Sequence, residues 1–110
     1  MRPHDLEELR QWAAPRQGIE AYIEPETMLN EMSVVVVDAA GNFLRRPIGG
    51  PKGIDAVSQA LAVPAYDVEV TGYPQRMRDR IEQERLIKKR QEQARRRAAR
   101  GETDPESNRG

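Results

Sequence analysis

The chain has 110 residues, of which 33% are charged and 37% hydrophobic, and its 18 basic and 18 acidic side chains give a formal net charge of zero. This length allows one small domain with an appended segment. The absence of cysteine excludes disulfides, thiolate nucleophiles and thiolate metal sites, and no apolar run reaches the roughly 18 residues of a membrane span.

The first element that the sequence predicts is a short helix. Asp5 is placed to cap its free N–H groups, and Glu8 three residues later completes a capping-box pattern. Leu6 and Leu9 belong to an apolar face, because apolar residues recur here at spacings of three and four. Pro15 ends the helix, since the residue before a proline is disfavoured in the helical conformation.

Three strands follow the first helix. Residues 19–23 alternate apolar with polar, which predicts a strand with one buried and one exposed face. Residues 32–37 contain four consecutive valines, which is typical of a central strand shielded on both faces. A turn containing glycine and asparagine leads to residues 43–48, which return antiparallel to complete a hairpin. Pro47 places this third strand at an edge of the sheet.

The next two elements are a second helix and a fourth strand. Residues 52–62 carry an apolar stripe at helical spacing, and Pro51 suits the first turn of that helix. Residues 66–70 alternate apolar with polar and predict the strand.

A long helix is predicted from residue 75 to residue 100, where glycine and proline are absent. We expect Met77 and Ile81 to contact the body, with Leu86 as a further candidate. Beyond Lys88 its only apolar residues are alanines. Because an isolated polar helix is marginally stable in water, we expect its distal half to fray.

These elements follow the order α-β-β-β-α-β-α. The simplest arrangement that buries their apolar faces is an α+β fold, with a small, mainly antiparallel sheet of about four strands, helices on one face and a long basic C-terminal helix. Charge divides the chain in the same way, because residues 1–75 carry −5, residues 76–100 carry +7 and residues 101–110 carry −2. We therefore expect a body at 1–75, a basic helical arm at 76–100 and a disordered tail at 101–110.

Residue types that perform catalysis or bind metal are sparse. His4 is the only histidine, and no residues around it have the spacing of metal ligands. The three serines lie outside any nucleophile-elbow context, and the glycine pattern of dinucleotide-binding folds is missing. We expect no catalytic residue, no metal site and no cofactor.

Two weaker patterns leave alternatives open. Glu20 and Glu24 would form an acidic patch with the carboxylates of the strand at residues 66–70 if the two strands are neighbours; otherwise they lie on ordinary exposed faces. Residues 49–53, Gly-Gly-Pro-Lys-Gly, precede a helix. They form either an anion-binding loop assisted by the preceding arginine pair or a turn that needs glycine for its backbone conformation.

The basic arm is the strongest functional pattern. Closely spaced cationic side chains on a helix can neutralise several phosphates, and the absence of aromatic residues from the arm argues against stacking on bases. The alternative is a solvated helix held by pairs such as Glu84 with Lys88. The residues that we expect to bind an anionic partner are Arg76, Arg78, Arg80, Lys88, Lys89, Arg90, Arg95, Arg96 and Arg97.

Several short stretches also carry a family resemblance. They are Trp12-Ala13-Ala14-Pro15-Arg16, Glu24-Pro25-Glu26-Thr27, the valine run, Tyr66-Asp67-Val68 and, most specifically, Gly72-Tyr73-Pro74-Gln75-Arg76-Met77-Arg78-Asp79. On these stretches the chain resembles a family of short uncharacterised actinobacterial proteins over about residues 11–80. Some members of such families are labelled oxidoreductases, and the resemblance implies no catalytic residues.

Our hypothesis is a small non-enzymatic binding protein whose basic C-terminal helix docks on an anionic partner: RNA, the ribosome, DNA or an acidic protein surface. One alternative is a small oxidoreductase, or a subunit of one, without a recognisable cofactor motif. Another is a structural homodimer. We expect a cytoplasmic location without membrane association, because the first ten residues lack the apolar core of a signal peptide.

Overall fold

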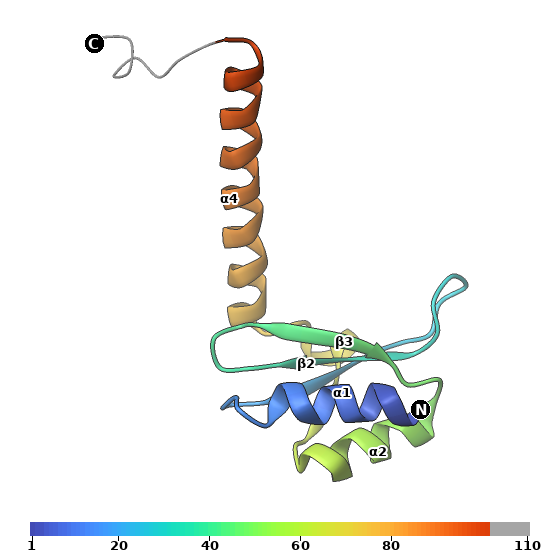
Figure 1. Cartoon of the computed structure of the whole chain (residues 1–110). Coiled ribbons are helices and arrows are strands. Elements are labelled where there is room, and N and C mark those ends of the chain that lie inside the picture. The colour runs from blue at the N-terminus through green and yellow to red at the C-terminus, as the bar shows by residue number, and fades with distance from the viewer. Residues whose placement is uncertain (102–110) are drawn as a thin grey trace. The chain divides into compact units, whose positions relative to one another are not determined.

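The computed structural model describes residues 1–101, and within them it confirms the α+β class, the element order and the long C-terminal helix (Figure 1). These residues belong to two compact units, of which one ends at Arg80 and the other begins at Ile81. The elements in chain order are α1 (Pro3–Ala13), β1 (Glu20–Glu24), β2 (Ser33–Val37), β3 (Phe43–Pro47), α2 (Pro51–Leu61), β4 (Ala65–Asp67), α3 (Val68–Thr71) and α4 (Gln75–Ala99).

The sheet has the strand order β3-β2-β1-β4. β2 pairs antiparallel with both β1 and β3, and β4 adds one parallel pair at the far side of β1. The valine run therefore forms a central strand, and all four valines, Val34 to Val37, are fully buried. β3 lies at an edge as Pro47 predicts, because proline has no N–H to donate to a further strand.

Helices α1 and α2 cover one face of the sheet (Figure 1). Leu9 of α1 and Val57 of α2 pack in one core cluster with alternate residues of the strands, among them Ile23 and Val36. Full burial of each such side chain stabilises the fold by about 1.5–3 kcal/mol. Packing in this cluster explains why apolar residues recur at spacings of three and four in both helices. It also explains why alternate residues of the strands face these helices.

The opposite face of the sheet is also covered. Tyr22, Val35, Val37 and Met77 form a second buried cluster, and the partly buried rings of Phe43, Tyr66 and Tyr73 pack against it. The expectation of one exposed face on β1 is therefore wrong, because three consecutive residues of β1, from Ala21 to Ile23, are buried. On this face Tyr22 is covered by aromatic residues from distant parts of the chain and by the first turn of α4.

Helix α1 begins two residues before the predicted cap. Pro3 occupies the first turn, where its fixed φ favours helix entry, and no side chain caps the helix. Asp5 lies inside the first turn and is buried, with one carboxylate oxygen 3.9 Å from Nε of Arg46. The capping-box assignment is wrong, because this carboxylate faces a side chain of the sheet.

The fourth strand is shorter than the sequence predicts. It ends at Asp67, and Val68–Thr71 form the short helix α3, in which Val70 is 82% exposed. The Asp67 carboxylate accepts a hydrogen bond from the N–H of Glu69 at 2.9 Å and so caps α3. The alternating pattern was misleading, because a local side-chain cap competes with strand pairing.

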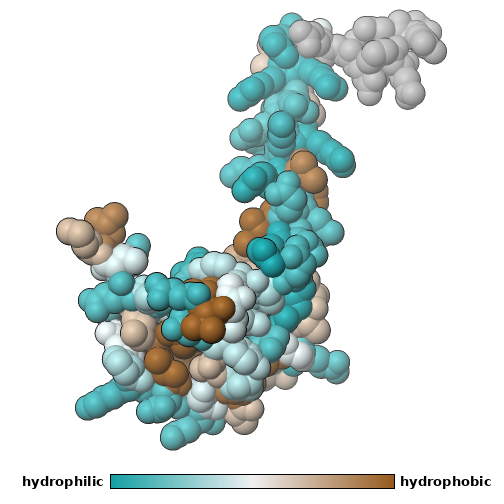
Figure 2. All heavy atoms as spheres, turned by 180° about the vertical axis from the view of Figure 1, so that it is seen from behind, coloured by the Kyte–Doolittle hydropathy of each residue, from teal (hydrophilic) through white to brown (hydrophobic). Residues whose placement is uncertain are grey.

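Helix α4 runs almost as far as predicted. Met77 is only 2% exposed, whereas Ile81 and Leu86 are exposed. The boundary between the two units therefore lies after Arg80, five residues later than the sequence suggests. The helix beyond Arg80 is mostly hydrophilic (Figure 2). Of the predicted disordered tail, residues 102–110 lie outside the described residues.

Candidate functional site

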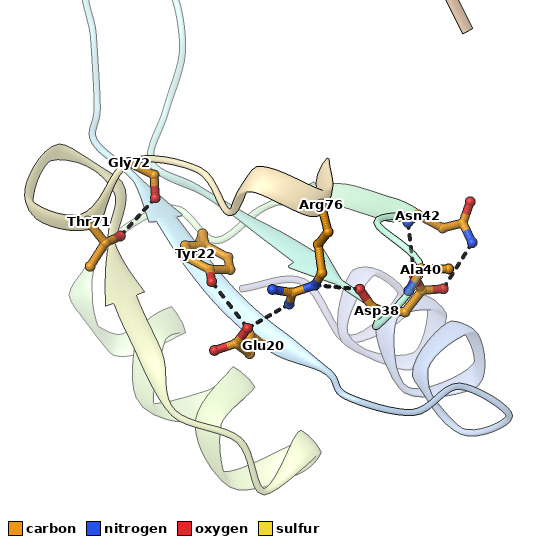
Figure 3. A network of polar contacts seen from close by, with 8 residues as sticks. All are labelled: Glu20, Tyr22, Asp38, Ala40, Asn42, Thr71, Gly72 and Arg76. Atoms are coloured by element: carbon orange, nitrogen blue, oxygen red, sulfur yellow. Dashed lines mark hydrogen bonds and ion pairs between the residues drawn. The ribbon is translucent and has the colours of Figure 1, made fainter. Parts of the chain in front are cut away.

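The first turn of α4 is fixed to the folded unit by an arginine (Figure 3). Nε of Arg76 donates to the backbone carbonyl of Asp38 at 2.8 Å, and Nη2 donates to the Glu20 carboxylate at 2.6 Å. The hydroxyl of Tyr22 donates to the same carboxylate at 3.3 Å. Burial, followed by the negative charge of Glu20, raises the pKa of Tyr22. Arg76 is thus neutralised inside the fold.

The β2–β3 turn brings the backbone of α4 into close contact with the sheet. Gly41 has a φ of +90°, and a Cβ placed there would lie 2.1 Å from the carbonyl oxygen of Arg76. The carboxylate of the buried Asp38 accepts the N–H groups of Ala40 and Asn42 at 3.0 and 2.9 Å and pairs with Arg16 at 3.2 Å. The sequence indicates the turn but not this close approach.

The other predicted binding residues lie on exposed positions of α4. Arg78 and Arg80 follow Met77 within the first unit, and every residue from 81 to 100 is exposed. Residues 81–100 contain eight basic and three acidic side chains, so this segment carries a net charge of +5. The structure thus separates Arg76 from the other eight predicted residues, which are Arg78, Arg80, Lys88, Lys89, Arg90, Arg95, Arg96 and Arg97.

Helical geometry arranges these charges in stripes. At 3.6 residues per turn, basic residues at successive spacings of 7, 4, 7 and 4 lie on a single face of a helix. One set of five basic residues in α4 has this spacing and spans about 33 Å at a rise of 1.5 Å per residue. The N–H of the last member donates to the carbonyl of Arg96 at 3.1 Å, which continues the helix by one residue. The set, called here the basic stripe, is Arg78, Arg85, Lys89, Arg96 and Arg100.

The basic stripe adds two residues that the sequence reasoning did not single out. Arg85 and Arg100 are absent from the nine predicted residues, although Arg100 follows closely on the cluster at residues 95–97, and helical spacing places both in line with Lys89 and Arg96. Arg85 pairs with Glu82 at 3.6 Å, but both side chains are more than half exposed, so this pair contributes little to stability. Lys88 and Arg95 lie to one side of the stripe, and Arg90 and Arg97 lie to the other.

A second group of polar residues lies at the end of the sheet where β1 ends and β2 begins. The Glu24 carboxylate accepts hydrogen bonds from Ser33 at 2.7 Å, from Arg45 at 2.6 and 3.0 Å, and from the hydroxyl of Tyr73. Burial alone would raise the pKa of Glu24, but the hydrogen bonds from Arg45, Tyr73 and Ser33 outweigh it and lower that pKa. Burial and the bond to Glu24 raise the pKa of Tyr73.

The acidic patch that the sequence predicts for the case of neighbouring strands does not form a cluster of free carboxylates. β1 and β4 are neighbours, but Glu20 is bound by Arg76 and Glu24 by Arg45. Within residues 1–101, no three histidine, aspartate or glutamate side chains are grouped so that they could hold a metal ion.

The glycine-rich segment at residues 49–53 runs into the first turn of α2, where the backbone requires glycine. Gly53 is buried, and a Cβ there would lie 2.5 Å from the carbonyl oxygen of Ile48. The preceding arginines face away from an anion at this loop, because Arg45 binds Glu24 and Arg46 binds Glu8. These contacts favour the turn interpretation over the anion-binding loop.

In comparisons with known proteins, no family model, no curated protein and no solved structure matches the chain. The resemblance over about residues 11–80 stays a prediction from the sequence. In the part of the chain that the structure describes, no helix combines the length and the apolar character needed to cross a lipid bilayer.

Proposed function

We propose that this protein is a non-enzymatic nucleic-acid-binding protein that contacts the phosphate backbone through the basic helix beyond Arg80. The observation that carries this proposal is that every residue from 81 to 100 is exposed, together with the net charge of +5 of this segment. The folded unit differs, because its Arg16, Arg45, Arg46 and Arg76 are bound to carboxylates far along the chain. Arg85, in contrast, pairs with Glu82 of its own helix, and both side chains are more than half exposed.

The physical basis of the binding is counterion release. Each phosphate that a lysine or arginine neutralises sets free condensed counterions, so the affinity falls steeply with salt. The basic stripe can follow a phosphate backbone for about 33 Å, given a rise of 1.5 Å per residue. Residues 81–100 contain no aromatic side chain that could stack on a base, so the binding is independent of base sequence.

The test measures the binding of the full chain to labelled duplex RNA and duplex DNA of mixed sequence, by fluorescence anisotropy. The plot of log affinity against log salt, between about 50 and 200 mM, is expected to have a slope of about −4 to −5 if the five stripe residues each neutralise one phosphate. The variant Lys89→Gln/Arg96→Gln/Arg100→Gln is expected to reduce the steepness of this slope by about three.

The matched control removes the same amount of charge from the folded unit. Arg2→Gln/Arg10→Gln/Lys52→Gln changes three exposed basic residues outside α4 and is expected to leave the slope nearly unchanged. Absence of binding at low salt would contradict the proposal, as would equal losses in the two triple variants.

The oxidoreductase alternative rests on the resemblance alone, and no contact among the described residues favours it. A thermal-shift measurement with flavin and nicotinamide nucleotides tests it directly, because a bound ligand raises the melting temperature.

A further inference from the structure

The loop between β1 and β2 presents two large apolar side chains to solvent. Leu29 is 92% exposed and Met28 is fully exposed, and the tip of this loop is visible as an apolar projection from the first unit (Figures 1 and 2). The tip is an ordered turn, because Thr27 Oγ1 accepts the N–H groups of Leu29 and Asn30 at 3.3 and 3.0 Å. An apolar pair held out in this way is typical of a docking surface.

The same loop forms one wall of a cavity of about 730 Å³ at the end of the sheet. Thr27, Asn30 and Glu31 line it from the loop, and Pro47 and Val68 line it from the opposite elements. The floor is the Glu24 network described above, in which the charges of Glu24 and Arg45 neutralise each other. We call the cavity and the Met28–Leu29 tip together the loop groove.

Acidic side chains surround the loop groove. Glu26 and Glu31 belong to the loop itself, and Glu69 follows the groove residue Val68. All three carboxylates are on exposed residues, and no basic side chain of the described chain pairs with them. The surface therefore combines apolar anchors with an unneutralised negative rim.

The chain itself carries a helix with the complementary character. Beyond Arg80, α4 is strongly basic, and the exposed Ile87 shares one face with Ala94 and Ala98 at spacings of seven and four. This face lies opposite the basic stripe, and Lys88, Arg90 and Arg95 flank it more closely. A helix with an apolar face of this kind can dock into a groove through residues at helical spacing.

We propose that the loop groove of one copy of this chain binds helix α4 of a second copy. The Ile87–Ala94–Ala98 face packs against the Met28–Leu29 tip, and the flanking basic residues lie against the acidic rim. The inference goes beyond nucleic-acid binding, because it assigns the acidic end of the folded unit as the partner surface. Self-association and binding to phosphates use the same helix through opposite faces.

The first measurement is sedimentation velocity of the full chain over a concentration series, in the absence of nucleic acid. We expect self-association that strengthens with protein concentration and weakens with salt, because the contact includes exposed charges. A chain that stays monomeric over the whole series at low salt would overturn the proposal. That outcome leaves the nucleic-acid proposal untouched, so the two fail independently.

Two charge-reversed variants give the decisive test. Glu26→Lys/Glu31→Lys/Glu69→Lys makes the rim basic, and Lys88→Glu/Arg90→Glu/Arg95→Glu makes the helix acidic. Each variant alone is expected to be monomeric, because its helix and its rim then carry the same sign. An equimolar mixture is expected to associate again, because the reversed rim of one complements the reversed helix of the other. Circular dichroism and melting curves verify that both variants fold.

The apolar part of the contact is tested separately. Met28→Ser/Leu29→Ser changes only exposed loop positions, so its melting temperature should equal that of the parent chain while its self-association weakens at least tenfold. Failure of the two charge-reversed variants to associate on mixing would overturn the proposal. Self-association that none of the three variants alters would overturn it as well.

Discussion

The first turn of helix α4 and the remainder of the same helix use the same residue types for opposite purposes. In the first turn, Arg76 is bound to Glu20 and to the carbonyl of Asp38, and Met77 is buried in the second core cluster. Beyond Arg80 every residue to position 100 is exposed. The comparison teaches that the role of an arginine depends on whether the fold encloses it beside a carboxylate of a distant element, as it does for Arg76 and Glu20, or leaves it exposed, as it does for Arg85.

The buried turn also explains how such a polar helix can form. Nucleation is the costly step of helix formation, because several dihedral angles must be fixed before the first hydrogen bond is gained. Contacts of Arg76 and Met77 fix these angles as part of the folded unit. The residues that follow then need only propagate the helix, which their high propensities favour.

The largest loss of stability is expected from Gly41→Ala, which disturbs the contact with the first turn of α4. The new Cβ would lie 2.1 Å from the carbonyl oxygen of Arg76, at a residue whose φ is +90°. Backbone strain and overpacking together should lower the free energy of unfolding by about 3–5 kcal/mol. Urea denaturation measures this loss, and Gly49→Ala, with a positive φ but open space around it, is the matched control. Equal losses in the two variants would show that the contact with α4 is unimportant.

A second prediction compares two apolar residues of the same helix. Met77→Ala should lower the free energy of unfolding by about 2–4 kcal/mol, because it empties a core position that is only 2% exposed. Leu86→Ala should change it by less than about 0.5 kcal/mol, because Leu86 is exposed. Denaturation curves of both variants test the difference, and a large loss for Leu86→Ala would place a core contact beyond Arg80.

A smaller effect concerns pH and the Glu24 network. Because the pKa of Glu24 is lowered in the folded state, its contribution to stability is present above its ordinary value of 4.5 and is lost as the pH falls below it. The pKa of Tyr73 is raised, so its contribution is present below its ordinary value of 10.0 and is lost at higher pH. Unfolding measured from about pH 6 to about pH 3 should show less acid destabilisation for Glu24→Gln than for the parent chain. If the free energy of unfolding falls equally with pH in both proteins, the role of Glu24 is contradicted.

Local patterns in the sequence predict much of the fold. The valine run predicts a doubly shielded strand, Pro47 predicts an edge, and uninterrupted helix-forming residues predict α4 almost to its last residue. Each of these signals depends on the periodicity or the backbone chemistry of one short segment. For that reason they hold without knowledge of the tertiary structure.

The features that the sequence could not show depend on partners far along the chain. Arg76 lies 56 residues from Glu20, and nothing near Arg76 distinguishes it from Arg78. Asp5 resembles a helix cap until Arg46 is placed beside it, and the apparent strand at residues 68–70 is ended by the cap that Asp67 provides. The basic stripe depends on helical spacing rather than on closeness in sequence, because Arg85 and Arg96 share a face only when α4 is one continuous helix.

The central claim is that the positive charge beyond Arg80 makes contact with phosphates while Arg76 holds the fold. Arg76→Gln and Arg96→Gln remove one charge each from the same helix, so measuring unfolding and salt-dependent binding for both is the most direct test. Arg76→Gln should lower the free energy of unfolding by about 1–3 kcal/mol and leave the salt slope unchanged. Arg96→Gln should leave stability unchanged and reduce the steepness of the slope by about one. Similar slopes for Arg96→Gln and the parent chain, or a reduced slope for Arg76→Gln alone, would contradict the account.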